Sequence, residues 1–548
     1  MRSNQIPPCA SRTLLKRRDF LKLAGAAALV FPRLGESVAP AVPALDKPAV
    51  PAGPARPNIL FIMVDEMKWN VMSCAGHALV KTPHLDRLAR EGTRFATAYT
   101  VAPICTPSRY SFFTGRYAHV HGAIDNNTPP REPQVLLPAI LHQQGYQTAL
   151  SGKLHFIPEN LAYHFDYFWS FAGEGPHRLP TWPEDVEKKH GAGAGRKLTV
   201  QPFPADPLGR GLGRLAYPKE DAQTFWITDR AVDFLGQRDK TRPFFLFVSY
   251  LDPHSPSHLC EPYWTMFDAG KMPLPSSFKQ DPNQPLQSAG THHVNDPGIV
   301  KAMTAAYLAK VTMVDDNIGR LLGHMRDQGL ADNTLIVFTA DHGNMLGDLN
   351  RWFKGVMYEG SARIPLLMKV PAASPQAAQF NRGAVVNEIV ENIDVMPTLC
   401  ELAGVPLPKQ GIQGRSLTAL VAGQEPGWKN RAFAERNSRM IRTRQYKLIH
   451  EPRGAGSYEL YDLINDPLEM HNLIDDPARA AVVKDLAAQL EAWQKDLPPV
   501  PVIAGVAPEP APGKASPAKK ELKKEQRAKQ RRGAVPADGG STAPKGIP

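Results

Sequence analysis

The feature that most constrains the fold is an apolar run that stops abruptly at two carboxylates. Residues 59–64 (ILFIMV) are followed directly by Asp65 and Glu66. A short run without polar residues is typical of a strand buried on both faces, because a strand with one face exposed to solvent would alternate apolar and polar residues. The run therefore predicts an α/β fold, and it places Asp65 and Glu66 at the carboxyl end of a strand, where such sheets hold their ligands.

Three further segments repeat this pattern of an apolar strand with a polar tip. The segments YQTALSGKLHF, RPFFLFVSYLDPHSP and NTLIVFTADHGNMLG end in Lys153 and His155, in Asp252 and His254, and in Asp341 and His342. Stretches with helical spacing, such as TPHLDRLAREGTRF and YLAKVTMVDDNIGRLLGHM, lie between them. We predict a large, mostly parallel sheet flanked by helices, with the polar tips converging on one edge.

The last part of the chain has a different pattern. RMIRTRQYKLIHEP and SYELYDLINDP alternate like antiparallel strands, and ARAAVVKDLAAQLEAWQKDL has helical spacing. We therefore predict a main domain over 57–430 and a smaller α+β subdomain with an antiparallel sheet over 431–500. Residues 501–548 are rich in Pro, Ala and Lys, so they predict a basic disordered tail.

The net charge of +11 comes from the two ends of the chain. Residues 1–33 carry a net charge of +6 and residues 501–548 another +6, which leaves −1 for the residues between them. The basic composition is therefore no argument for a nucleic-acid partner, and we expect none. We interpret the basic stretch 514–532 as a solvated tail, with binding to an acidic polysaccharide or envelope surface as the alternative.

The N-terminus has the features of an export signal. In LLKRRDFLKLAGAAALVF, Arg17 and Arg18 precede an apolar run that is too short for a permanent membrane helix. We predict a twin-arginine signal over 1–35, a Pro/Ala linker over 36–56, and passage through the twin-arginine export machinery to the periplasm or the medium. The alternative is an amphipathic N-terminal helix.

Five cysteines are few for 548 residues, and no CxxC pair indicates a zinc site or a disulfide scaffold. We expect Cys74 to lie in a loop or as a buried thiol. Pairing of Cys260 with Cys400 is left open. Cys105 opens the run CTPSRYSFFTGR, where it could be a nucleophile, half of a disulfide, a core residue or a precursor of something else.

The strand tips supply the ligand types that a hard divalent cation prefers. The donors are Asp65, Glu66, Asp341 and His342. A single aspartate at a strand end is most often a turn or cap residue, but two separate strand-end pairs favour a metal site. Cations and proton donors come from Arg109, Lys153, His155, His254 and Lys354. Such a set can bind a charged tetrahedral anion and stabilise the negative charge that develops on the leaving oxygen during the reaction.

The run CTPSRYSFFTGR resembles the signature of the type I, formylglycine-dependent sulfatases of the alkaline phosphatase superfamily. In that signature, Cys-x-Pro-Ser-Arg directs conversion of the cysteine to formylglycine. Other family elements occur in order along the chain, one before this run and five after it, and they match NILFIMVDE, GKLHF, DPHSP, TADHGNMLGD, WFKGVMYEGSARIPLL and ELYDLINDPLEMHNL. The resemblance covers most of the body, so it implies a catalytic sulfatase domain over 57–430.

The resemblance implies covalent catalysis by a hydrated aldehyde at position 105. One hydroxyl of the gem-diol, bound to the metal, attacks sulfur, and the alcohol leaves with help from a proton donor. The second hydroxyl then loses its proton, sulfate is eliminated and the aldehyde returns. A serine or a thiolate lacks that second hydroxyl. A formylglycine-generating enzyme or an equivalent maturase is therefore an expected partner.

The resemblance also assigns the metal ligands. Asp65, Asp341, His342 and the modified Cys105 match metal positions, and Glu66 stands where relatives carry Asp or Gln. The expected metal is Ca²⁺, with Mn²⁺ as the alternative.

The remaining roles concern substrate and protons. The resemblance implies that Arg109 orients the gem-diol and the metal carboxylates, and that Lys153 and Lys354 bind sulfate oxygens. It implies that His155 partners the gem-diol hydroxyl during release. His254 is the expected leaving-group acid and a substrate contact, together with Lys354.

Three functional hypotheses follow. The first is an exported sulfatase acting on the sulfate ester of a carbohydrate or another alcohol. The second is a phosphonate monoester or phosphodiester hydrolase of the same superfamily, and the third is a sulfated-glycan binding protein with an inactive site. Specificity is expected in the loops 157–222 and 255–300 and in AERNSRMIRT, whereas structural roles are expected for His119, His121 and Asp252.

Overall fold

The computed structural model describes residues 56–158, 161–170, 181–191, 212–215, 217–279, 293–374, 376–377, 380, 383–407, 411–452 and 456–498. The predicted signal, almost all of the predicted linker and the predicted tail lie outside the described residues. Among the helices within these ranges, none is long and apolar enough to cross a membrane.

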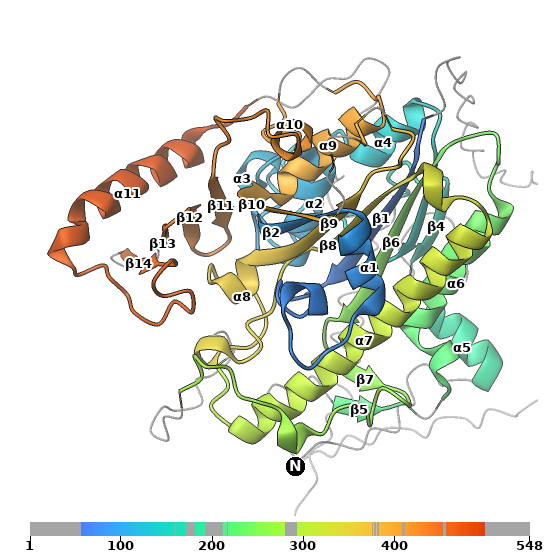
Figure 1. Ribbon diagram of the computed structural model, residues 1–548, viewed down its shortest axis with the longest axis horizontal. Helices are drawn as coiled ribbons and strands as arrows, with labels where there is room; N and C mark the ends of the chain where they lie inside the picture. Colours follow the sequence, from blue (N-terminus) through green and yellow to red (C-terminus); the bar gives the residue numbers. More distant parts are fainter. Residues whose placement is uncertain are drawn as a thin grey trace, which may run out of the picture. The chain divides into compact units, whose positions relative to one another are not determined.

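An eight-stranded sheet forms the centre of the described structure (Figure 1). Its strand order is β10-β2-β9-β8-β1-β6-β3-β4, and β9 is antiparallel to both of its neighbours while all other pairs are parallel. The strands are β1 (Asn58–Asp65), β2 (Thr93–Tyr99), β3 (Gln147–Gly152), β4 (Tyr167–Ser170), β6 (Phe244–Pro253), β8 (Thr334–Ala340), β9 (Arg363–Lys369) and β10 (Ala384–Glu391). The predicted large, mostly parallel sheet is confirmed.

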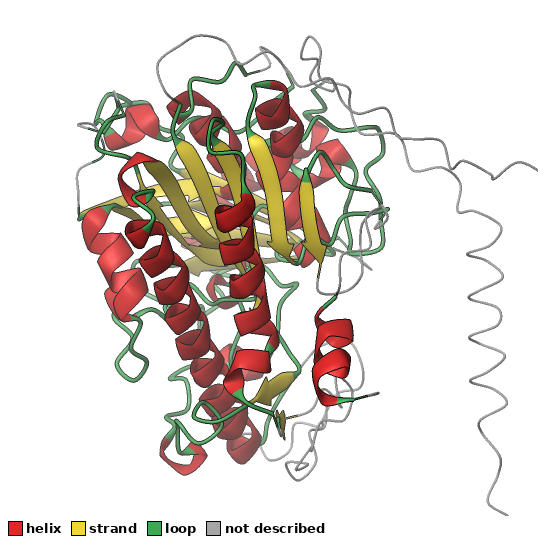
Figure 2. Cartoon of the chain, turned by 90° about the vertical axis from the view of Figure 1, so that its right-hand side faces the viewer, coloured by secondary structure: helices red, strands yellow, loops and turns green. Residues whose placement is uncertain are grey.

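The central strand β1 is buried on both faces, as its apolar run predicts. Ile59, Phe61 and Met63 belong to one hydrophobic cluster, and the alternate residues Leu60, Ile62 and Val64 belong to another. Helices α2 (Cys105–Thr114), α4 (Leu137–Gln143) and α9 (Val395–Leu402) supply side chains to the first cluster. Helices α1 (Pro83–Glu91), α6 (Gln223–Gln237) and α7 (Pro297–Asp327) supply the second, so helices cover both faces of the sheet (Figure 2).

Shorter elements connect these layers. They are the helices α3 (Ala118–His121), α5 (Trp182–His190), α8 (Glu359–Ala362) and α10 (Thr418–Val421) and the paired strands β5 (Leu212–Arg214) and β7 (Ser257–Leu259).

The predicted antiparallel sheet near the end of the chain is also confirmed. It contains β11 (Arg431–Glu435), β12 (Arg439–Thr443), β13 (Tyr446–Glu451) and β14 (Ser457–Asp462), and the helix α11 (Ala480–Lys495) follows. Phe433 of this sheet stacks on Trp493 of α11, with ring centroids 4.8 Å apart. The division of the chain at residue 430 remains a prediction.

A buried ion network joins the small sheet to the segment that follows Lys354. The Lys447 ammonium, fully buried on β13, lies 2.8 Å from Glu359 Oε1 and 2.6 Å from Glu469 Oε1. It also donates a hydrogen bond to Met357 O at 3.0 Å. Because an unpaired charge at this depth would be costly, the network holds the two parts in one arrangement.

Candidate active site

Two irregularities at the end of β1 bring consecutive carboxylates to one place. Neighbouring residues of a regular strand point to opposite faces. The register with β6 shifts between Val64 and Asp65, and Glu66 has a φ of 70°, a left-handed conformation that non-glycine residues rarely adopt. Carboxylate oxygens of Asp65 and Glu66 therefore both lie within 4.8 Å of a His254 ring nitrogen.

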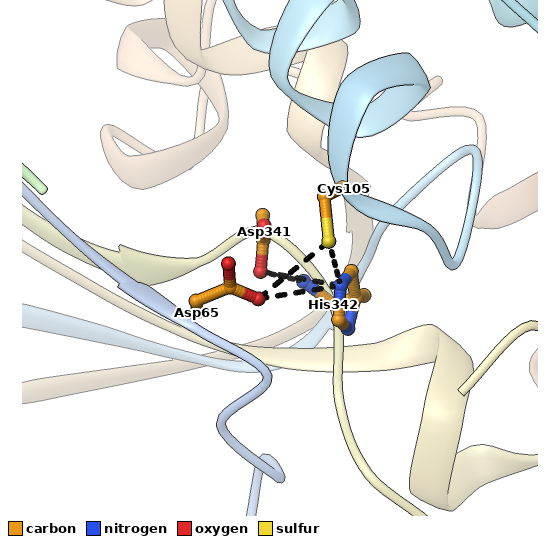
Figure 3. Close-up of side chains that lie close together, drawn as sticks. All are labelled: Asp65, Cys105, Asp341 and His342. Atoms are coloured by element: carbon orange, nitrogen blue, oxygen red, sulfur yellow. Dashed lines mark hydrogen bonds and ion pairs between the residues drawn. The ribbon is translucent and has the colours of Figure 1, made fainter. Parts of the chain in front are cut away.

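Four residues form a buried cluster at the carboxyl ends of β1 and β8. One side-chain donor atom each from Asp65, Cys105, Asp341 and His342 lies within 4.8 Å of the others. Cys105 points from the start of α2 toward the other three (Figure 3), with its Sγ 3.2 Å from His342 Nε2 and 3.7 Å from Asp65 Oδ1.

The donors of this cluster fit a divalent cation. His342 Nδ1 lies 3.0 Å from the carbonyl of Gly343, which can only accept a hydrogen bond. When the ring gives up its Nε2 proton to bind a cation, Nδ1 therefore keeps the other proton and the lone pair of Nε2 faces the cluster. Two buried aspartates and an imidazole lone pair are ligands that calcium, manganese and similar ions accept.

Glu66 lies beside this four-residue cluster rather than within it. Its carboxylate accepts hydrogen bonds from Lys354 Nζ and from Asn344 Nδ2, each at 2.8 Å, and lies 3.3 Å from His254 Nε2. Glu66 thus connects the lysine and the histidine expected to contact substrate, and its role as a metal ligand stays a prediction.

The position of Cys105 favours an anion. Cys105 is the first residue of α2, where helix dipoles stabilise negative charge. Burial and Asp65 raise the pKa of its thiol, but the positive charges of Lys153, Lys354 and His342 outweigh them and hold this pKa well below its usual value. An anion at this point, whether thiolate or substrate, is therefore well stabilised.

The four-residue spacing between the cysteine and the arginine of the signature corresponds to about one turn of a helix. Arg109 lies four residues after Cys105 on α2, so both side chains project from the same face. The Arg109 side chain is fully buried, with Nε 2.9 Å from Asp341 Oδ2 and Nη2 3.5 Å from Asp65 Oδ2. Ser108 Oγ donates to the Asp341 carbonyl at 2.5 Å. The Ser-Arg pair thereby fixes the ends of both aspartate strands.

The tip of β3 carries Lys153 and His155 to the same edge. Lys153 Nζ hydrogen bonds to Asp65 Oδ2, and its carbonyl accepts from Arg109 Nη1 at 2.8 Å. The His155 carbonyl accepts from Thr106 Oγ1 at 2.9 Å, which places this residue beside the start of α2. The structure therefore brings both predicted residues next to Cys105.

His254 follows β6 and faces Glu66. Burial and the charge of Lys354 lower the pKa of the imidazole, against the raising effect of Asp65 and Glu66. A lower pKa makes the imidazolium a stronger acid, which suits proton transfer to a leaving oxygen.

Lys310 on α7 is a residue that the sequence interpretation missed. Its side chain is 1% exposed, and Nζ lies 2.6 Å from His254 O, 2.7 Å from Pro256 O and 2.8 Å from Asp252 Oδ1. Asp252, expected as a turn residue, thus pairs with Lys310 and stays outside the four-residue cluster. The sequence feature that could have indicated this role is a lysine in the middle of the apolar face of a predicted helix.

Replacement of Lys310 tests whether it positions His254. We expect Lys310→Met to lower kcat/KM about tenfold or more for alkyl sulfates, since a misplaced histidine protonates poor leaving groups badly, and much less for 4-nitrophenyl sulfate. The matched control is Lys301→Met on the same helix. Equal losses on both substrates would indicate a purely structural role.

The other predicted side chains have structural contacts. His119 Nδ1 lies 2.7 Å from Glu435 Oε1, and its ring packs against Trp493. Burial, with Arg116 and His119 nearby, lowers the pKa of His121 to about 3, so this ring is neutral. Cys74 is partly buried in a short 3₁₀ turn, and Cys260 and Cys400 are both buried and free, so they are not bonded to each other.

The fold and the site define a class of protein. A solved structure of a phosphonate monoester hydrolase from Agrobacterium radiobacter superposes with a TM-score of 0.69 and 26% identity, over 81% of this chain and 97% of that one. Together with the carboxylates, histidines and cations at the carboxyl edge of the sheet, this places the protein among the hydrolases of the alkaline phosphatase superfamily.

Sequence relatives specify the family. The sulfatase family model matches residues 57–405, and the model of the C-terminal part of N-sulphoglucosamine sulphohydrolase matches residues 347–496. The arylsulfatase of Clostridium perfringens is 30% identical over 80% of this chain and 96% of its own length. The N-acetylglucosamine-6-O-sulfatase of Bacteroides thetaiotaomicron is 31% identical over 80% of this chain and 86% of its own. The chain belongs to the sulfatase family and is a sulfuric ester hydrolase.

Proposed function

We propose that the protein is an exported sulfatase that hydrolyses the sulfate ester of a carbohydrate to the alcohol and inorganic sulfate. The observation that carries the proposal is the position of Cys105, buried at a helix start among two aspartates, two lysines and a histidine. Conversion of Cys105 to formylglycine, followed by addition of water to its aldehyde, supplies two hydroxyls on one carbon, one for attack on sulfur and one for release of sulfate.

The carboxylates around position 105 are matched in number by lysine and arginine side chains. Three carboxylates, those of Asp65, Glu66 and Asp341, face three cations, those of Arg109, Lys153 and Lys354. A divalent cation held by Asp65, Asp341, His342 and the modified residue, Ca²⁺ in our proposal, would polarise an oxygen of the sulfate group. The site would then carry excess positive charge and attract a sulfate monoanion.

The protein's own side chains supply the remaining chemistry. Lys153 and Lys354 bind sulfate oxygens. In the unmodified protein, the negative charges of Cys105, Glu66 and Asp65 raise the pKa of Lys354 against the effect of burial, and the two carboxylates remain beside it after Cys105 is converted. Arg109 holds both aspartates in place. His254 donates a proton to the leaving alcohol, and His155 accepts one from residue 105 when sulfate is released.

Two observations support a sugar as the alcohol. One relative is an N-acetylglucosamine-6-O-sulfatase, and the C-terminal family model is that of N-sulphoglucosamine sulphohydrolase. The proposal includes export through the twin-arginine signal at 1–35, which cell fractionation checks.

Phosphonate monoester or phosphodiester hydrolysis is the second candidate, because the Agrobacterium radiobacter structure shares this fold. Sulfuryl and phosphoryl groups are both tetrahedral, so the site geometry alone suits either. The test is a panel of sugar sulfates, aryl sulfate, phosphate monoester, phosphodiester and phosphonate substrates with the matured protein. We expect the highest kcat/KM for a sugar sulfate. A higher value for the phosphonate or the phosphodiester would reverse the order of the two candidates.

A further inference from the structure

The turn between β11 and β12, within the segment AERNSRMIRT, brings a cation from the C-terminal sheet to the active site. Arg436 packs directly on Gly355, the residue after Lys354. A Cβ atom on Gly355 would lie 1.9 Å from Arg436 Nη1, and Gly355 has a φ of 89°. Only glycine satisfies both the close approach and this backbone conformation.

Arg436 also contacts the segment beside Cys105. Its Nη2 lies 3.6 Å from Asp125 Oδ1. The next residue, Asn126, accepts a hydrogen bond through Oδ1 from the backbone N–H of Thr106 at 3.0 Å. The guanidinium therefore lies between the segment that carries Lys354 and the segment packed on the residue after Cys105.

The hydrogen-bonding capacity of Arg436 is not used up by these contacts. Its Nε is buried and has no hydrogen-bond partner among the described residues. The ion pair with Asp125 is long, and the Asp125 side chain is 55% exposed, so water weakens it. An incoming anion can therefore compete with Asp125 for Nη2 of the guanidinium.

The turn holds Arg436 in place before any ligand arrives. The Arg436 N–H donates to Ser438 O at 2.9 Å, and the preceding Glu435 carboxylate accepts from the N–H of His119 at 2.6 Å. The ion network of Lys447 fixes the same sheet against α8. Because the backbone of the turn is already fixed, binding through Arg436 costs mainly the conformational entropy of its side chain.

We infer that Arg436 is a specificity-determining residue that binds a second anionic group, a carboxylate or another sulfate, on the alcohol part of the sulfate ester. Both groups present paired oxygens that match the donor fork of a guanidinium. The neighbouring Lys354 binds the scissile sulfate, so Arg436 meets the part of the substrate beyond it. The inference rests on the proposed function and specifies its substrate class.

The test compares three sulfated pyranosides with the same ring and the same ester position. One is otherwise neutral, one carries a carboxylate and one carries a second sulfate. We expect the matured wild type to prefer an anionic substrate in kcat/KM, and Arg436→Gln to reduce that preference about tenfold or more. Arg436→Lys, which keeps the charge and loses the fork, should retain part of it. Comparison of kcat/KM for the carboxylate and the disulfate substrate shows which anionic group Arg436 binds.

The control is Arg444→Gln, which removes a 67% exposed arginine from the turn between β12 and β13 and should leave the preference unchanged. An unaltered preference in Arg436→Gln, or equal losses on all three substrates, would overturn the inference. Calorimetric binding of the same sugars to Cys105→Ala protein, with and without Arg436→Gln, gives a readout without turnover. If the matured wild type released sulfate from none of the three pyranosides, the proposed function would be wrong. The calorimetric comparison of binding would then decide whether Arg436 binds an anionic group.

Discussion

Replacement of Cys105 by alanine is expected to lower kcat for any sulfate ester by about 10⁴-fold or more, the range seen when a covalent nucleophile is removed. The side chain lies where Asp65, Asp341 and His342 converge, and Lys153 and Lys354 lower its pKa. Alanine leaves these groups in place with nothing to attack sulfur. Steady-state sulfate release measures the loss.

Cys105→Ser distinguishes a formylglycine mechanism from a simple hydroxyl or thiol one. A serine keeps one oxygen at the same place, so it can accept a sulfuryl group once but has no second hydroxyl to expel it. We expect a single turnover followed by a stable sulfated serine, visible by mass spectrometry of the peptide. In the matured wild type, the peptide over 94–109 should contain an aldehyde at position 105.

Cys74→Ala is the matched control for both changes, because Cys74 lies outside the buried cluster and should leave kcat near the wild-type value. An unmodified Cys105 in fully active protein, with Cys105→Ala also active, would rule out the covalent mechanism.

Asp341→Asn should damage stability and activity together. Asp341 Oδ2 accepts from Arg109 Nε at 2.9 Å, and Oδ1 accepts from the backbone N–H groups of Glu66 and His342, each at 3.0 Å. An asparagine must turn its NH₂ group toward one of these donors. Among the described residues, it also leaves the fully buried guanidinium with Asp65, at 3.5 Å, as its one remaining carboxylate partner.

Because breaking a buried ion pair leaves an uncompensated charge, we expect the free energy of unfolding to fall by about 3–5 kcal/mol. We expect kcat to fall about 10²–10³-fold, since a preorganised charge at the reaction centre is lost. Urea denaturation and sulfate release measure the two effects. Asp332→Asn, an exposed carboxylate in a short 3₁₀ turn, is the control. An unchanged urea midpoint in Asp341→Asn would contradict the role of this ion pair.

The main sheet could be predicted because its signal is local. Six apolar residues in a row at 59–64 show burial on both faces, and the structure divides them between two hydrophobic clusters. The long helix was predicted from 307 onward, but α7 begins at Pro297, ten residues earlier. There Asp296 caps the helix through the N–H groups of Gly298 and Ile299, a start signal that apolar spacing does not reveal.

The contacts of Glu66 show where local reasoning ends. Its position after Asp65 was clear from the sequence, but its partners Asn344 and Lys354 lie 278 and 288 residues away in the chain. Whether a carboxylate faces a cation site, a lysine or both depends on how the strand end bends, and the left-handed backbone at Glu66 has no sequence signal of its own.

The sequence by itself determined the class of fold and the edge of the sheet that carries the chemistry. These features follow from the repeat of apolar and polar residues in strands and helices, which is visible within a few residues of sequence. Only the tertiary structure decided that Lys310 holds the backbone of His254 and that Arg436 packs on Gly355. Those contacts join segments 56 and 81 residues apart, so they depend on packing between elements, which no local pattern records.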